Sequence, residues 1–247
     1  MVVTIIRKEL SMLFISPLAW IMLALIQLVF AGFFLVRLDA FLEIQSQLLQ
    51  VINSPGITEV IISPVFALAA IVLLMLTPIL SMRLLAEERR NRTLTLLISS
   101  PVSIIDIVLG KFLGLMIFLA VVIMLIVALS ISLRIGGVLD LGLLLSNVLG
   151  LFLVTACFSA LGLYVSSLTA QPVIAAIGSL GVLLGLWMID LVASETDGWV
   201  HYISLLKHFR HFNQGLIDTL SIAYCILFIV IFLVLTIRHL DGERLHG

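Results

Sequence analysis

The sequence predicts an all-α integral membrane protein with six transmembrane helices, and three observations lead to this prediction. Hydrophobic residues make up 62% of the 247 residues and charged residues only 11%, whereas soluble domains contain about 25% charged residues. Apolar runs of about 20 residues, enough for a helix to cross a hydrocarbon core of about 30 Å, recur along the chain. The remaining charge is concentrated, because six of the 27 charged residues lie between Arg83 and Arg92.

The first predicted element is a helix over residues 1–16 that lies in the membrane plane. Polar residues share one helical face, and apolar residues recur on the other at Val2, Ile6, Leu10 and Leu13. This division is typical of an interfacial helix. Ser16 and Pro17 then turn the chain into the first span, because proline disfavours helix in the residue before it and suits a first helical turn. The expected result is an N-terminal elbow.

Six segments are apolar and long enough to span the membrane. They cover residues 17–36, 61–82, 108–133, 143–167, 172–192 and 221–238. The first run exceeds the about 7 to 15 apolar residues of a signal-peptide core, so it counts as a span. No soluble domain interrupts the spans, so residues 1–247 are expected to form one transmembrane domain. Three pairs of small residues four apart favour close helix packing within it: Gly110 and Gly114, Ala156 and Ala160, and Gly181 and Gly185.

The distribution of lysine and arginine predicts the orientation. An even number of spans puts both termini on one side of the membrane. Four basic residues would then lie on the opposite side, namely Arg37, Arg134, Lys207 and Arg210. The other nine would lie with the termini, namely Arg7, Lys8, Arg83, Arg89, Arg90, Arg92, Lys111, Arg238 and Arg244. We therefore expect both termini in the cytosol and the protein in a bacterial inner (cytoplasmic) membrane.

The charged segment after the second span is expected to continue as an amphipathic helix. Glu87 lies four residues after Arg83, and Glu88 lies four before Arg92. Opposite charges would thus meet on one helical face and contribute about 0.2 to 0.5 kcal/mol per pair. The helix is expected to end near 99–101, before a second helix that starts at Ser103 with Asp106 in its first turn.

An ordinary solvated loop is the alternative for this segment, because arginines there would satisfy the positive-inside rule without any further role. Leucine and isoleucine recur between the charges, however, and a solvated loop does not need them. We favour a helix–turn–helix lever that presents a docking surface to a cytosolic partner.

The residues of this segment resemble those of the ABC-2 type permeases of ATP-driven transporters. The matching motifs are Glu87-Glu88-Arg89-Arg90, Thr93-Leu94, Ser100-Pro101-Val102-Ser103 and Gly110-Lys111. The family pattern usually has Gly and Glu where this chain has Arg92 and Thr95. Residues 208–218, followed by a span containing Tyr224, are similar to the gliding-motility type branch. The motifs Arg7-Lys8-Glu9-Leu10 and Ser16-Pro17-Leu18 fit as well.

The resemblance implies the permease subunit of an exporter, with a coupling helix between spans two and three. Its partners would be two P-loop ATPase subunits and either a second copy of this chain or a sister permease, with the dimer seam at spans one and five. The implied ATPase-coupling residues are Glu87, Glu88, Arg89, Arg90, Arg92, Thr93 and Pro101.

No catalytic residue or cofactor is expected in this chain, because ATP and magnesium would bind to the partner ATPase. The only Gly-Lys pair is Gly110-Lys111, and Ile105 and Phe112 stand where a P-loop requires Gly and Ser or Thr.

The segment at 194–220 mixes aromatic and basic residues suited to a membrane interface. Two roles are expected for it, interfacial packing or an outer gate over the exit path, with His201, His208, Phe209, His211 and Phe212 as the gate candidates. The histidines alone do not make a metal site, which needs further ligands and residues that orient them, so none is expected.

Other functional classes fit the sequence less well. A net charge of −1 disfavours a nucleic-acid partner. Secondary carriers normally use mid-span charges, which are lacking here, and no nucleophile and base pair marks an intramembrane enzyme. A membrane scaffold or assembly factor that recruits a soluble partner without transport remains the main alternative.

Overall fold

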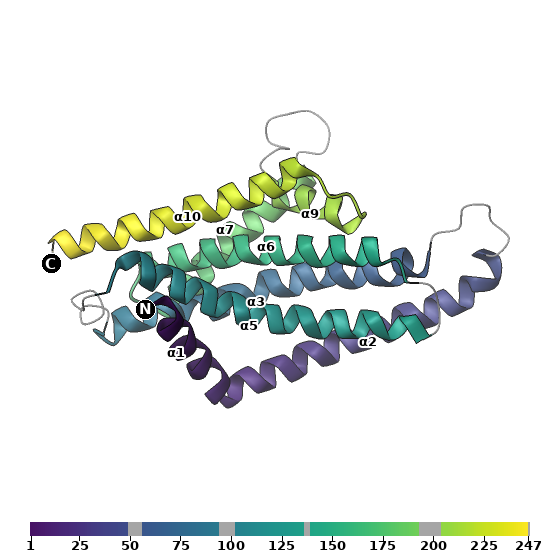
Figure 1. Ribbon diagram of the computed structural model, residues 1–247, viewed down its shortest axis with the longest axis horizontal. Coiled ribbons are helices and arrows are strands. Elements are labelled where there is room, and N and C mark those ends of the chain that lie inside the picture. Colours follow the sequence, from purple (N-terminus) through teal and green to yellow (C-terminus); the bar gives the residue numbers. More distant parts are fainter. Residues whose placement is uncertain (49–55, 94–101, 136–138, 193–203, 247) are drawn as a thin grey trace.

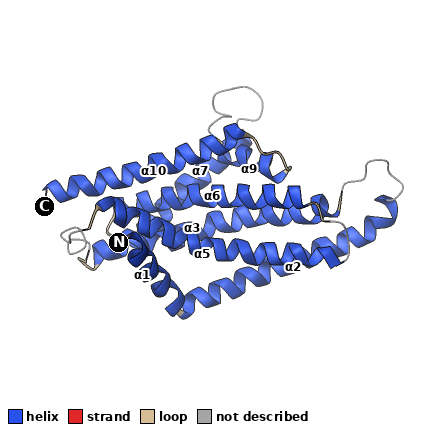
Figure 2. Ribbon diagram, viewed as in Figure 1, coloured by secondary structure: helices blue, strands red, loops and turns tan. Residues whose placement is uncertain are grey.

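The computed structural model describes residues 1–48, 56–93, 102–135, 139–192 and 204–246, and this part of the chain is helical without any strand (Figure 2). Two short elements are the π-helix η1 (Thr58–Ile62) and the 3-10 helix η2 (Leu133–Ile135). Eight α-helices complete the described part: α1 (Val2–Ile15), α2 (Pro17–Leu48), α3 (Ser63–Arg90), α5 (Ile104–Ser132), α6 (Leu141–Leu168), α7 (Pro172–Val192), α9 (Leu205–Asn213) and α10 (Thr219–His246). The all-α prediction is confirmed.

Five stretches of helix are long and apolar enough to cross a membrane. They are Ala19–Glu43, Thr58–Arg90, Ile104–Ser132, Leu141–Leu168 and Thr219–Arg244. Each contains most or all of one predicted span. The predicted span at 172–192 coincides with α7, within which Pro172–Met188 is a shorter apolar helix. The chain is therefore an integral membrane protein, while the count of six spans stays a prediction.

Helix α6 lies at the centre of the bundle, in contact with α3, α5, α7, α9 and α10 (Figure 1). Its small residues Ala156 and Ala160 are buried, as the four-residue spacing predicted. The most apolar windows of α3 and α6 are 61% and 67% buried, against 28% for α2 and 22% for α10. Helices α3 and α6 thus form the core, and α2 and α10 lie at its sides.

The N-terminal elbow has the predicted junction. Helix α1 ends at Ile15, Ser16 is extended (φ −72°, ψ 123°), and α2 begins at Pro17. The Trp20 indole N–H donates to the carbonyl of Phe14 over 2.9 Å and so satisfies one acceptor at the end of α1. Helix α1 lies across the first half of α5, and α2 leaves it at a sharp angle (Figure 1). Its position in the membrane plane stays a prediction.

Close packing of α1 on α5 depends on Gly110 and Gly114, one of the residue pairs predicted to allow close helix packing. A Cβ at Gly110 would lie 2.8 Å from the Cβ of Ile5, and one at Gly114 would lie 3.0 Å from the Cβ of Glu9. Side chains at these positions would push the helices apart. The other predicted glycine pair differs, because a Cβ at Gly181 or Gly185 would have no atom within 4 Å among the described residues.

Candidate functional site

Both chain termini, the end of α3 and the start of α5 lie at one end of the bundle (Figure 1). We call this the charged end and define it by Glu9, Glu88, Arg89, Lys111 and Glu243, whose side chains form ion pairs there. It brings together the N-terminal, coupling and Gly-Lys motifs that are far apart in the sequence.

Helix α3 ends earlier than predicted. Its last residue is Arg90, and Asn91 follows as the C-cap. The amide of Thr93 donates to the carbonyl of Glu88 (3.0 Å), and that of Arg92 to Arg89 (3.1 Å), which is the Schellman pattern of a helix C-terminus. The predicted helical pairing of Glu88 with Arg92 is therefore wrong, because the helix stops between them. Residues 94–101, with Pro101 and the predicted coupling helix, lie outside the described residues.

Arg92 takes the position in this motif that glycine usually occupies. Its φ is 57°, in the left-handed region, which costs a residue with a Cβ roughly 1 to 2 kcal/mol. Arg92, which departs from the motif that the sequence resembles, therefore has a structural consequence: an arginine adopts a strained conformation at the end of the helix.

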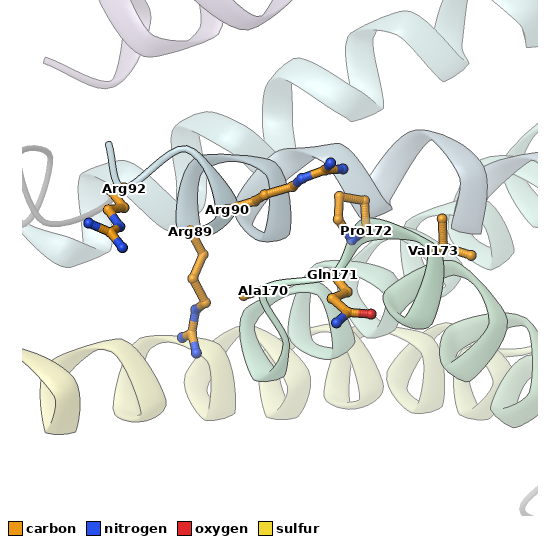
Figure 3. Close-up of a pocket in the computed structure, with 7 residues that line it drawn as sticks. All are labelled: Arg89, Arg90, Arg92, Ala170, Gln171, Pro172 and Val173. Atoms are coloured by element: carbon orange, nitrogen blue, oxygen red, sulfur yellow. The ribbon is translucent and has the colours of Figure 1, made fainter.

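A groove of about 510 Å³ opens between the end of α3 and the turn from α6 to α7 (Figure 3). Figure 3 shows Arg89 reaching toward α10; its Nη2 lies 2.6 Å from Oε1 of Glu243. Three of the seven lining residues are arginines and none of the seven is acidic, so the groove suits an acidic group. Its lining residues are Arg89, Arg90, Arg92, Ala170, Gln171, Pro172 and Val173.

A buried ion cluster lies behind this groove and connects α1, α3 and α5. The ammonium of Lys111 is 2.7 Å from Oε1 of Glu9 and 2.9 Å from Oε1 of Glu88. The side chains of Lys111, Glu9 and Glu88 are only 2%, 9% and 16% exposed. Lys8 reaches the same Glu88 oxygen from solvent at 3.4 Å, with a side chain 53% exposed. The cluster thus has one fully buried cation between two carboxylates.

Sequence patterns did not single out Lys111 and Glu9 as site residues. Two signals could have done so: Lys111 lies within an otherwise apolar run, and Glu9 shares the helical face of Ile6 and Leu13. An ionisable residue on an apolar face requires a partner when that face is buried.

Ser166 of α6 connects to the backbone of α3 just before the charged end. Its hydroxyl accepts from the amides of Leu85 (3.2 Å) and Ala86 (3.0 Å) and donates to the carbonyl of Met82 (3.1 Å). In a regular α-helix the amide of Ala86 bonds to the carbonyl of Met82 directly. The Ser166 hydroxyl therefore bonds to both the carbonyl of Met82 and the amide of Ala86, the two backbone groups that pair in a regular helical turn.

The predicted coupling residues differ in their surroundings. Glu87, Arg90, Arg92 and Thr93 are exposed, whereas Glu88 and Arg89 are half-buried. Glu88 and Arg89 bind to other helices of the same chain, through Lys111 and Glu243. Among the predicted coupling residues that the structure describes, Glu87, Arg90, Arg92 and Thr93 thus face solvent, whereas Glu88 and Arg89 face other helices.

The outer-gate candidates lie at the opposite end of the bundle, except His201, which is outside the described residues. Phe209 and Phe212 are buried, and His211 is half-buried. His208 is buried, with Nδ1 3.0 Å from the hydroxyl of Ser221 and its ring stacked on Tyr224 at 4.3 Å.

Hydrogen bonds from side chains to backbone carbonyls hold the end of α9 to two core helices. The Ser146 hydroxyl donates to the carbonyl of Phe212 (2.8 Å), the Ser63 hydroxyl donates to the carbonyl of Asn213 (3.1 Å), and the side-chain amide of Asn213 donates to the carbonyl of Ser63 (2.9 Å). Helix α9 is thus anchored to α3 and α6. Within the described residues, no three His, Cys, Asp or Glu side chains are grouped closely enough to hold a metal.

Residues 3–241 match the family model described as ABC-2 family transporter protein. The chain belongs to this family. A search of curated proteins gives no match. The ABC-2 match covers nearly the whole chain and, with the apolar helices, suggests an ABC transporter permease. Membrane subunits of this family are generally not catalytic and work with ATPase partners. The gliding-motility type branch stays a prediction.

Proposed function

We propose that this chain is the permease subunit of an ABC exporter of a bacterial inner membrane, in which two separate P-loop ATPase subunits bind ATP and magnesium. ATP hydrolysis in those subunits drives the movement of substrate across the membrane. Membership of the ABC-2 family supports the permease role. The second half of the membrane unit is another copy of this chain or a sister permease.

The observation that carries the proposal is the arginine-lined groove beside the exposed end of α3. In the proposed complex, acidic side chains of an ATPase subunit bind to Arg90 and Arg92, and Glu87 and Thr93 form the rest of the described contact surface. Arginine suits this role because its planar guanidinium binds a carboxylate through two hydrogen bonds. The adjoining coupling segment contains Pro101.

Glu88 and Arg89 have a different role in this proposal from the one expected of them. Their ion pairs with Lys111 and Glu243 hold the end of α3 against α5 and α10. They orient the contact surface rather than bind to the ATPase. A force that the ATPase applies at Arg90 is therefore transmitted from α3 to α5 and α10.

The proposed topology has six spans, with α7 as the fifth, and both termini in the cytosol. The positions of the N-terminus, the C-terminus and the end of α3 at one end of the bundle support it (Figure 1). In this topology α1 is the interfacial elbow, and residues 1–247 form one transmembrane domain. Helix α9, which contains the first part of the 208–218 motif of the gliding-motility type branch, then lies on the outer side, where His208, Phe209, His211 and Phe212 cover the exit path.

The test is a detergent pull-down of the tagged protein from its native membrane, with partners identified by mass and assayed for ATP hydrolysis. A stoichiometric P-loop ATPase is expected with the wild type. Arg90→Glu reverses an exposed charge and should release the ATPase while the melting temperature of the permease stays the same. Arg7→Glu is the matched control, because Arg7 is also exposed but lies on α1.

Three outcomes contradict the proposal. Recovery of the permease without any ATPase favours the scaffold or assembly factor. Full retention of the ATPase by the Arg90→Glu variant shows that the contact lies elsewhere. Transport that follows an ion gradient without ATP would identify a secondary carrier.

A further inference from the structure

A continuous set of contacts runs from the end of α3 through Lys111 and Glu9 to α1 and α2. We propose that Lys111 and Glu9 are positioning residues of the coupling site: they join the last turn of α3 to the elbow, so that a partner that moves this turn also moves α1 and α2. The inference rests on the proposed function of the charged end, and it identifies the route by which the first span is driven.

The first step of this route is the ion cluster itself. Lys111 holds Glu88 of α3 and Glu9 of α1 on one ammonium group, at 2.9 and 2.7 Å, with only 2% of its side chain exposed. Water cannot easily replace either carboxylate at such a buried site. Separation of α3 from α1 here would leave a buried charge without its partner, which is strongly unfavourable. The two helices therefore move together at this point.

The second step is the seating of α1 on α5. Ile5 and Glu9 of α1 lie over Gly110 and Gly114, where added Cβ atoms would approach to 2.8 and 3.0 Å. Glu9 is the buried residue of α1. Packing of these side chains directly on the glycine backbone of α5 leaves little freedom for α1 to slide, so α1 follows the start of α5 as well as the end of α3.

The third step is the junction between α1 and α2. The Trp20 indole donates to the carbonyl of Phe14 over 2.9 Å, and the ring of Phe14 contacts those of Trp20 and Phe118 at 5.8 and 5.6 Å. Helix α2 packs only lightly on α1, α3 and α5, and its most apolar window is only 28% buried. The covalent junction of α1 with α2, with its Phe14–Trp20 contacts, therefore joins the first span to the charged end.

Helix α3 runs unbroken from Ser63 to Arg90, but two features can weaken its hydrogen-bond ladder between Pro78 and the last turn. Pro78 lacks an amide donor, and the Ser166 hydroxyl lies between the carbonyl of Met82 and the amide of Ala86. Groups inserted into a helical hydrogen-bond ladder are a recognised cause of bending. The last turn of α3 can therefore change its angle to the rest of α3 while its ion pairs keep it joined to α1.

Hydrogen exchange on the purified permease, without any ATPase, tests the connection itself. Glu9→Gln keeps the shape of the side chain and removes its charge, and α1 amides are expected to exchange about tenfold faster. Lys8→Gln is the matched control, because Lys8 contacts the same Glu88 oxygen from solvent, and its effect should stay within about twofold. Unchanged exchange of α1 in Glu9→Gln and in Lys111→Gln overturns the inference.

The route to α2 is tested in the complex with the ATPase. Spin labels replace Val36 on α2 and Ile71 on α3, whose side chains are exposed, and the distance between them is measured with and without a non-hydrolysable ATP analogue. The distance is expected to change in the wild type and in Lys8→Gln but not in Glu9→Gln, although the ATPase stays bound.

The two proposals fail in different ways. A full distance change in Glu9→Gln, even with a lowered melting temperature, shows that Glu9 only stabilises the fold and overturns the route. If the wild type binds no ATPase, the proposed function fails, while the exchange experiment still decides whether Lys111 and Glu9 position α1.

Discussion

Replacement of Lys111 by methionine removes the one buried cation between Glu9 and Glu88 and keeps a side chain of similar length. A unit charge pair 2.7 Å apart attracts by about 6 kcal/mol at an effective dielectric constant of about 20. Desolvation of each buried ion offsets several kcal/mol of this attraction. Loss of one partner from a buried pair costs about 3 to 5 kcal/mol, and we expect a loss of this size for Lys111→Met.

The assay is the melting temperature of the purified permease in detergent, measured by its tryptophan fluorescence. At about 2 to 4 °C per kcal/mol for a chain of this length, the expected fall is roughly 6 to 20 °C. The control is the triple variant Glu9→Gln/Glu88→Gln/Lys111→Met, which removes all three charges. It should regain most of the loss, because replacing a whole buried ion cluster is often nearly neutral.

Two results would refute this reasoning. A fall of less than about 2 °C for Lys111→Met would mean that water or another cation already compensates the carboxylates. A triple variant as unstable as the single one would mean that packing of the lysine stem, rather than its charge, stabilises the charged end.

Three further predictions concern backbone geometry and helix contacts. Arg92→Gly relieves the left-handed strain at the end of α3 and should raise unfolding stability by about 1 kcal/mol, with weaker ATPase retention as its second readout. Ser166→Ala leaves the bridged amides of α3 without the α6 hydroxyl and should cost about 1 to 3 kcal/mol. The control Ser167→Ala removes a hydroxyl that donates to the Tyr164 carbonyl of its own helix, and it should cost less in the same denaturation curve. Gly162→Leu would force a side chain into Ser81 of α3 and should lower the melting temperature strongly, whereas Gly181→Leu, with no atom within 4 Å among the described residues, should leave the monomer unchanged.

Features with a local cause agree well between the sequence and the structure. The break at Ser16-Pro17 and the start of α7 at Pro172 follow from the fixed φ and missing amide of proline. The close approach of α1 to α5 follows from the spacing of Gly110 and Gly114, although the spacing did not identify α1 as the helix that packs there.

The end of α3 illustrates where pattern reading failed. Helical spacing of charges through Arg92 predicted a continuous helix, but the chain leaves the helix at Asn91 with Arg92 in the left-handed region. A helix end is normally recognised in a sequence by a glycine just after the C-cap. Arg92 occupies that position here, so the sequence did not indicate that the helix ends. The same pattern also misassigned the partner of Glu88, which binds to Lys111 instead.

The sequence by itself determined that this protein is a helical membrane protein, roughly where most of its helices begin, and which segment concentrates its charge. These properties depend on the length, periodicity and composition of each segment. Only the tertiary structure decided that Lys111 pairs with Glu9, 102 residues away, and that Ser166 bonds to the backbone of Met82. The physical reason is burial: an ionisable or hydroxyl side chain must find its partner on whichever helix covers it, and no single segment specifies that neighbour.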